Sequence, residues 1–136
     1  CAWLRSSGGN GTTLRNSLVI NEAGCDKSIE CASFYTGYVE NCTVIVKGKC
    51  TVGVGKYSGG WVKNTVVMLE GTGTCLNGSF TTTASSDTSG TVTNVTAADF
   101  VDYAGGNYAA KIGGALAGAG TDLSADFLDD IDGTAR

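Results

Sequence analysis

Four of the six cysteines are almost evenly spaced along the chain. Cys1, Cys25, Cys50 and Cys75 are separated by 24, 25 and 25 residues. The rest of the sequence keeps nearly the same period, and a fixed period of about 20–50 residues is typical of a solenoid. Because residues at equal repeat positions stack in a solenoid, we expect these cysteines to form a column.

A motif centred on asparagine repeats with the same period. It occurs at residues 14–20 (LRNSLVI), 39–45 (VENCTVI) and 62–68 (VKNTVVM), with a weaker copy at 92–98 (VTNVTAA). The asparagines are Asn16, Asn41, Asn64 and Asn94, spaced by 25, 23 and 30 residues. An aliphatic residue stands two positions before each of them. We expect the aliphatic positions to stack inside the fold and the asparagines to form a side-chain amide ladder at a corner.

The repeating unit has the composition of β-strands. Val, Ile and Thr dominate its apolar runs, no window holds a 3.6-residue period, and 21 glycines separate the short runs. A coil of about 23–25 residues with two or three short strands has the size of one parallel β-helix rung. The sequence therefore predicts an all-β parallel β-helix of about three to five short rungs.

The phrases LRNSLVI, VENCTVIV and VKNTVVML resemble the recurrent rung of the right-handed parallel β-helix repeat proteins of bacteria. This broad group includes the pectate-lyase-like folds. The tail, at residues 100–102, 107–108, 118–121 and 130–133, also resembles the end of such domains, although Gly114-Ala115 stands where their tail often has Ser-Pro. The resemblance implies a right-handed coil of a bacterial or phage surface type, and it implies little about function.

The period divides the chain into two parts of one domain. Residues 1–96 are predicted to form the rungs, and residues 97–136, where the period breaks, an irregular C-terminal cap. Residues 79–90 are rich in Ser and Thr and are predicted to form a protruding loop or an extra edge strand. The Ala and Gly content of residues 107–119 is compatible with a short helix.

The charge of the chain excludes some classes of partner. A net charge of −4, with nine dispersed Lys and Arg, argues against nucleic acid or an anionic membrane as the main partner. No stretch of ~18 apolar residues is present, so no transmembrane helix and no membrane insertion are expected.

Six cysteines without a histidine favour disulfides over zinc, because Cys-only zinc sites usually contain pairs with ~2–4 residues between them. An oxidising location follows, either extracellular or on a cell or virion surface. The candidates for disulfide formation are Cys1, Cys25, Cys31, Cys42, Cys50 and Cys75.

The pairing of these cysteines stays open. Stacked rungs ~4.8 Å apart suit a disulfide between neighbours in the column. Cys1–Cys25 together with Cys50–Cys75 uses the whole column, and Cys25–Cys50 is the competing choice. A Cys31–Cys42 bond is compatible with either scheme, and a set of buried thiols is the alternative to all of them.

No catalytic constellation is found in the sequence. The absence of histidine excludes His-dependent triads. A lyase site would need calcium ligands at one repeat position in neighbouring rungs, but the acids of the rungs match only loosely, at Glu22 and Glu70. We therefore predict no catalytic, metal-binding or cofactor-binding residues.

Aromatic residues gather before two successive asparagines, at Tyr35, Tyr38, Tyr57 and Trp61. Tyr38 and Trp61 both stand three positions before their asparagine, so we expect them to stack. Facing outward, such a strip would contact sugar rings or a neighbouring subunit. Facing inward, it would be part of the core.

The predicted function is a non-enzymatic extracellular structural module that self-associates, as a filament or as a coat subunit. Open rung ends carry unpaired main-chain groups that favour stacking, and heterologous stacking gives filaments. The alternative is a carbohydrate-binding or polysaccharide-processing fragment, like a tailspike or a lyase, with a glycan as partner.

Overall fold

The computed structural model describes residues 2–4, 12–22, 25–31, 37–56, 60–78 and 80–121, and this part of the chain is mostly β-strand with almost no helix. The strands are β1 (Ala2–Leu4), β2 (Thr12–Arg15), β3 (Leu18–Asn21), β4 (Cys25–Cys31), β5 (Gly37–Glu40), β6 (Thr43–Val46), β7 (Cys50–Lys56), β8 (Trp61–Leu69), β9 (Thr74–Asn77), β10 (Thr81–Ser85), β11 (Phe100–Asp102) and β12 (Asn107–Ala110). A 3-10 helix, η1 (Ala97–Asp99), precedes β11. The branched side chains of Val, Ile and Thr suit this extended backbone.

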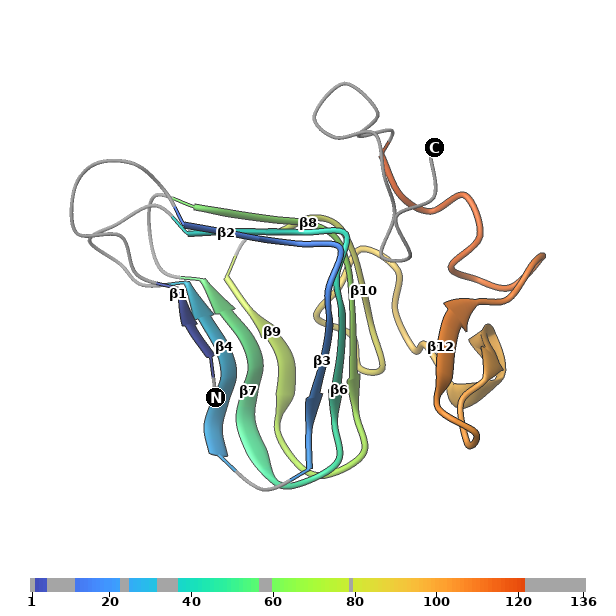
Figure 1. Ribbon diagram of the computed structural model, residues 1–136, viewed down its shortest axis with the longest axis horizontal. Coiled ribbons are helices and arrows are strands. Elements are labelled where there is room, and N and C mark those ends of the chain that lie inside the picture. The colour runs from blue at the N-terminus through green and yellow to red at the C-terminus, as the bar shows by residue number, and fades with distance from the viewer. Residues whose placement is uncertain are drawn as a thin grey trace.

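Parallel pairing joins strands that lie about one repeat apart in the sequence. One sheet has the order β1-β4-β7-β9, and a second has the order β2-β5-β8-β6-β3 with β10 paired to β8. Figure 1 shows the first sheet along one side of the molecule, with β2 and β8 along a second side and β3, β6 and β10 along a third. For the described residues, the prediction of a β-rich fold with parallel sheets is confirmed.

We call the strands that share one repeat a layer. The first layer holds β2, β3 and β4, the second holds β5, β6 and β7, the third holds β8 and β9, and β10 begins the fourth. The register places Val39 opposite Val62, and Val44 opposite Val67. All four valines are 0% exposed, so these aliphatic rows form the core between the sheets.

Asparagines with left-handed backbone form the corner between the second and third sides. Asn16, Asn41 and Asn64 have φ angles of 45°, 54° and 46°, a conformation that Asn tolerates better than most residues. The Asn41 side-chain amide donates to Oδ1 of Asn16 at 2.6 Å. The predicted amide ladder therefore joins the first two corners.

The fourth corner is formed by a threonine. The register of β8 with β10 places Thr82 opposite Asn64, and Thr82 also has a positive φ of 52°. Its Oγ1 accepts the backbone N–H of Asn64 at 3.3 Å. Asn94 does not continue the row, because it lies past the end of β10 and its N–H donates to the carbonyl oxygen of Asp87. The side chain of Asn64 instead bonds the backbone of Thr121, at 2.6 and 2.8 Å.

The stack of layers ends in a side-chain cap formed by residues 86–89. Oxygen atoms of Ser86, Asp87 and Ser89 accept the backbone N–H groups of Leu69 (3.0 Å), Cys75 (2.8 Å) and Leu76 (3.0 Å). These bonds replace those that a further strand would make. The Ser/Thr-rich stretch thus supplies the edge strand β10 and then the side-chain cap.

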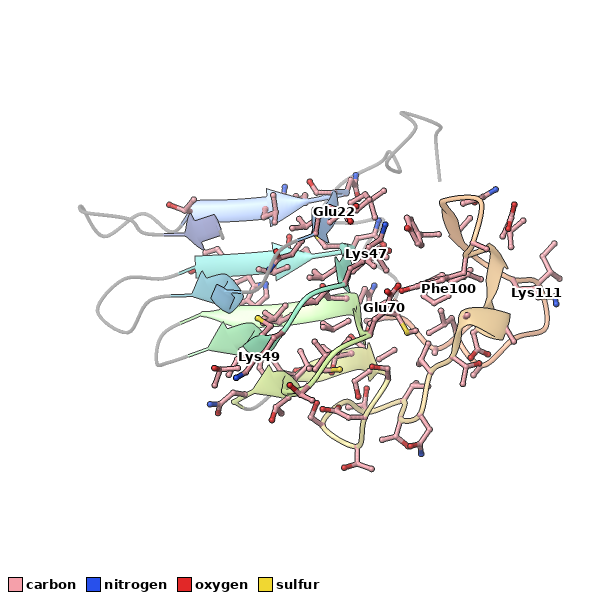
Figure 2. All side chains as sticks on the ribbon, turned by 90° about the horizontal axis from the view of Figure 1, so that it is seen from below. Glu22, Lys47, Lys49, Glu70, Phe100 and Lys111 are labelled. Atoms are coloured by element: carbon pink, nitrogen blue, oxygen red, sulfur yellow. The ribbon has the colours of Figure 1, made fainter. Side chains whose placement is uncertain are left out.

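Residues 97–121 cover a side of the stack. Phe100, Tyr103 and Tyr108 form an aromatic cluster that packs with Ile45 and Met68 on the outer face of β6 and β8. Both views show this segment beside the third side (Figures 1 and 2). Residues 107–119 contain β12 and turns where a short helix was compatible with the sequence.

The Asp87 cap predicts a loss of stability in acid. Partial burial raises the pKa of the Asp87 carboxyl, but hydrogen bonds from Ser89 and from the Cys75 amide outweigh burial and hold the pKa below its ordinary value. A lowered folded-state pKa contributes stability above the unfolded value of about 3.9, which is lost as pH falls through the folded value. Urea unfolding between about pH 5 and pH 2 should show a shallower loss for Asp87→Asn than for the wild type.

The matched control is Asp102→Asn, which removes the same charge outside the cap, where the carboxylate accepts the Gly105 amide at 3.0 Å. An equal pH dependence for Asp87→Asn and the wild type would contradict the role of the cap.

The corner predicts different costs for two substitutions of Asn41. Asn41→Ala loses the bond to Asn16 and places a Cβ-bearing residue at positive φ, for a cost of about 2 kcal/mol in the free energy of unfolding. Asn41→Gly loses the bond without the strain, for about 1 kcal/mol. Urea denaturation measures both, and equal values for the two variants would show that the left-handed backbone contributes nothing.

Candidate functional site

Two rows of side chains cover the outer face of β2, β5 and the first half of β8. Alternate residues of a strand point to opposite faces, so the neighbours of the buried Val39 and Val62 point outward. The register sets these neighbours in two rows, Thr13–Tyr38–Trp61 and Arg15–Glu40–Lys63.

Tyr38 and Trp61 stack, as their equal distance from Asn41 and Asn64 predicts. Their ring centroids lie 3.9 Å apart with an interplanar angle of 34°. Trp61 is 40% exposed, and Tyr38 is half-buried beneath it. The pair therefore faces outward and is not part of the core.

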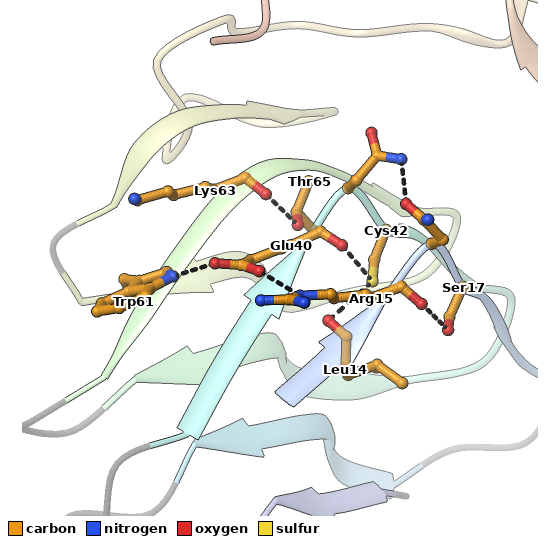
Figure 3. Close-up of polar contacts among 10 residues, drawn as sticks. Leu14, Arg15, Ser17, Glu40, Cys42, Trp61, Lys63 and Thr65 are labelled. Carbon is orange, nitrogen blue, oxygen red and sulfur yellow. Dashed lines mark hydrogen bonds and ion pairs between the residues drawn. The ribbon is translucent and has the colours of Figure 1, made fainter. Parts of the chain in front are cut away.

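Glu40 holds the two rows together. Its carboxylate accepts Nε of Arg15 at 2.7 Å and the indole N–H of Trp61 at 2.6 Å (Figure 3). The residue is only 2% exposed, and these two bonds offset the cost of burying its charge. Nζ of Lys63 lies 4.7 Å from the Trp61 ring centroid, so a cation also flanks the aromatic pair.

This face has the chemistry of a contact surface. Glu40 is almost fully buried, and each of its carboxylate oxygens accepts a hydrogen bond from another side chain of this face. Burial raises the pKa of the Cys42 thiol to about 11 and also raises the pKa of Cys75. Both thiols are thus protonated at neutral pH and are poor nucleophiles.

The described ranges contain no group of three or more His, Cys, Asp or Glu side chains that could hold a metal ion. They also contain no helix long and apolar enough to cross a membrane.

The cysteine column is interrupted at Cys75. The register places Cys25 opposite Cys50, as the spacing predicts. However, β7 and β9 pair Val52 with Thr74, 22 residues apart, so Cys75 falls opposite Gly53. Cys75 is a free thiol, so the Cys50–Cys75 bond, one of the pairings that the sequence left open, is not formed. The shorter connection shifts the register and moves Cys75 away from Cys50.

The other cysteines are placed as follows. Cys42 is a buried, free thiol whose Sγ donates to the carbonyl oxygen of Glu40 at 3.3 Å. Sγ of Cys50 donates to the carbonyl oxygen of Val52 at 3.0 Å. Cys1 lies outside the described residues, and for Cys25 and Cys31 the structure describes the backbone alone.

A groove of about 930 Å³ lies between the third side and residues 105–121. Asn41, Thr43 and Asn64 contribute polar groups to it, Val66 and Leu116 contribute apolar ones, and none of its described lining residues is charged. Tyr38 and Trp61 do not line it. The aromatic pair therefore lies on an open face, outside this groove.

The sequence patterns did not reveal a second row of charges. Glu22, Lys47 and Glu70 follow Asn21, Val46 and Leu69, which lie opposite one another in successive layers. Nζ of Lys47 lies 3.0 Å from Oε1 of Glu22, and Figure 2 shows the three charged residues in one line. The sequence shows Glu22 and Glu70 at matching repeat positions. The informative feature is Lys47, which stands at the same position in the layer between them and has the opposite charge.

Tyr35 and Tyr57, the remaining predicted contact residues, lie outside the described residues. Comparisons with protein-family models, with curated proteins and with solved structures gave no match. Function is therefore inferred from the geometry and chemistry of the described residues.

The Trp61–Glu40 hydrogen bond predicts an energetic coupling between the two residues. Trp61→Phe keeps a ring over Tyr38 but leaves one oxygen of a buried carboxylate without its donor, for a cost of about 1–2 kcal/mol. A double-mutant cycle with Glu40→Gln, followed by urea unfolding, should give a coupling of about 1 kcal/mol. The Tyr38→Phe variant is the control, and strictly additive Trp61 and Glu40 effects would contradict the coupling.

Proposed function

We propose that the chain is a right-handed parallel β-helix that serves as a non-enzymatic, extracellular structural module and assembles through the edge of its first layer. One observation carries this proposal, namely the difference between the two ends of the stack. At the last layers, side chains of residues 86–89 accept the backbone N–H groups. At the first layer, β2 and β3 each pair with a single strand within the described ranges.

The hydrogen-bond pattern of β3 defines the edge. The carbonyl oxygens of Ser17 and Asn21 accept from Thr43 (3.0 Å) and Lys47 (2.9 Å) of the second layer. Because bonds alternate along a parallel strand, Leu18 and Ile20 direct their N–H and C=O groups to the opposite side. Both side chains are 41% exposed. Such an edge is a template for an additional strand.

The cap limits the form of assembly. A head-to-tail filament needs two complementary ends, and the cap already occupies one of them. Attachment through the first-layer edge suits a coat or surface subunit better than a filament. Under this proposal, self-association would join two first-layer edges head to head.

The cysteines are compatible with an extracellular location. The composition of six cysteines without histidine favours oxidising surroundings. Cα atoms opposite one another on neighbouring strands, such as those of Cys25 and Cys50, are about 4.8 Å apart, within the range that a disulfide spans. Cys50 carries a thiol in this structure, so a Cys25–Cys50 bond would form only on oxidation, and it is then the pairing that the register favours.

Carbohydrate binding is the second candidate function, and the exposed Trp61 stacked on Tyr38 favours it. An aromatic face flanked by Lys63 suits the apolar face of a sugar ring. A glycan array compares the wild type with Trp61→Ala. Glycan binding that the wild type shows and the variant loses would support carbohydrate binding. A wild type that binds no glycan on the array would contradict it.

The edge predicts an effect of proline at position 20. The N–H of Ile20 points away from the second layer, so Ile20→Pro blocks pairing at the edge without removing a bond inside the stack. Analytical ultracentrifugation at rising concentration should show larger species for the wild type and for the control Ile20→Val, and monomers for Ile20→Pro. Thermal unfolding checks that the proline variant is folded, and unchanged assembly of a folded Ile20→Pro would overturn the proposal.

A further inference from the structure

The groove between the third side and residues 105–121 has a strand edge along one border. All four residues of β12 line the groove, and none of the β11 residues does. β12 therefore lies between β11 and the groove. Within the described part of the chain β12 pairs with β11 alone, so its second edge borders the groove.

The hydrogen bonds of the β11–β12 pair show which way the backbone of Ala110 points. The N–H of Lys111 donates to the carbonyl oxygen of Asp99 at 2.8 Å. Lys111 and Asp99 flank the Phe100–Ala110 pair, which is therefore the non-hydrogen-bonded kind of antiparallel pair. The N–H and C=O groups of Ala110 consequently point away from β11, toward the groove, and Ala110 is exposed. An edge of this kind is a template for a further strand.

The floor of the groove suits uncharged side chains. Thr43 points outward, because its neighbours Cys42 and Val44 belong to the core. The register places Thr43 between Leu18 and Val66. These three residues line the groove, and none of its described lining residues is charged. A charged side chain against this floor would lose hydration without gaining an opposite charge.

Another border of the groove already holds main chain. The Asn64 side chain donates to the carbonyl oxygen of Thr121 at 2.6 Å and accepts the N–H of the same residue at 2.8 Å. A side-chain amide thus binds both main-chain groups of one residue, as a neighbouring strand does. Residues 118–120, which are Gly, Ala and Gly, add little side-chain bulk to this border. Main-chain groups, and not charges, are what the groove binds within its own chain.

We propose that this groove binds an extended segment of a separate polypeptide, with uncharged side chains, as a third strand beside β12. Main-chain hydrogen bonds to Ala110 provide affinity, and the floor selects the side chains, since alternate residues of the added strand face it. A strand that pairs with all of β12 has a core of four residues. The pairing edge is β12 and not the first-layer edge, so the inference goes beyond the proposed assembly and stands without it.

The chain supplies an uncharged probe of strong β propensity, namely residues 91–98 (TVTNVTAA). The synthetic peptide is acetylated and amidated, which removes its terminal charges. One charged version carries Asn94→Asp with Val95→Asp, and another carries Asn94→Lys with Val95→Lys. Because neighbouring residues of a strand point to opposite faces, one charge meets the floor whichever face the peptide presents.

Amide chemical shifts of the full chain, followed by nuclear magnetic resonance during a peptide titration, measure binding, and amide hydrogen exchange locates it. The uncharged peptide should slow exchange of the Ala110 N–H. Both charged peptides should bind about tenfold more weakly, because each of them desolvates an unpaired charge. Equal affinity for all three peptides, or an Ala110 amide that the uncharged peptide does not protect, would overturn the inference.

Proline at position 110 tests strand addition directly. Ala110→Pro removes the N–H that the added strand needs, and that N–H points away from β11. This variant should bind the uncharged peptide about tenfold more weakly, whereas the control Ala110→Val should bind it as the wild type does. Thermal unfolding checks that the proline variant is folded. A folded Ala110→Pro with unchanged affinity would contradict pairing at β12.

A second variant leaves Ala110 intact and tests the floor. Thr43→Lys places a cation beside the bound strand, so it should bind the Asp-containing peptide more tightly than the wild type does. Its affinity for the Lys-containing peptide should stay low. If Thr43→Lys and the wild type bind the Asp-containing peptide equally, the floor does not contact the bound strand, and the inference fails.

Two further outcomes separate this site from the first-layer edge. Ile20 does not line the groove, so Ile20→Pro should leave peptide binding unchanged. If Ile20→Pro abolishes peptide binding, the peptide occupies the first-layer edge, and the inference fails while the proposed assembly stands. If Ala110 becomes protected without peptide as the protein concentration rises, a second copy occupies the groove, and the inference of a separate partner is overturned. Association through the first-layer edge alone leaves the exchange of Ala110 unchanged.

Discussion

In-register hydrogen bonding between parallel strands brings each position of a repeat against the same position of the next repeat. Every row must therefore contain side chains that tolerate their own kind or that alternate. Val39 packs against Val62, a residue of the same kind, in the core. The side-chain amides of Asn16 and Asn41 can hydrogen-bond each other because each amide has both a donor and an acceptor. Charged side chains cannot pair with their own kind, so Arg15, Glu40 and Lys63 alternate in sign.

The same constraint distinguishes the two ends of the stack from its middle. A layer in the middle has its backbone satisfied on both sides, whereas an end layer must find other partners. At one end, Ser86, Asp87 and Ser89 provide them with side-chain oxygens. At the other end, the edge of β3 directs the backbone of Leu18 and Ile20 outward, with a charge on each side. Under the proposed assembly, this asymmetry would leave the first-layer edge as the surface for association.

The interior rows could be predicted from the sequence because equal spacing is enough to define them. The amide contact of Asn41 with Asn16 and the stacking of Tyr38 with Trp61 were both predicted from their equal positions in the repeat. Cys75 could not be placed in this way, because Val52 pairs with Thr74 at a shorter separation than the cysteine spacing implies. Thr82 was hidden for a similar reason, since the corner after Asn64 comes early and lies within a Ser/Thr-rich stretch.

The candidate site was only partly visible in the sequence. Its aromatic pair was predicted, but the burial of Glu40 depends on Trp61 and Arg15 closing over the carboxylate from two other layers. The cap was also hidden, because a run of Ser, Thr and Asp has the composition of a solvated loop. Its role appears once Asp87 is seen to accept the N–H of Cys75.

The most direct test of the central claim is the strand register, measured by nuclear Overhauser contacts between backbone protons in solution. Val44 is paired with Val19 one repeat before it and with Val67 one repeat after it. Parallel in-register layers therefore predict contacts between amide protons and α-protons that join the residues around Val44 to the residues around Val19 and to the residues around Val67. Close contacts between α-protons of strands adjacent in the sequence, the pattern of antiparallel hairpins, would contradict the layered account.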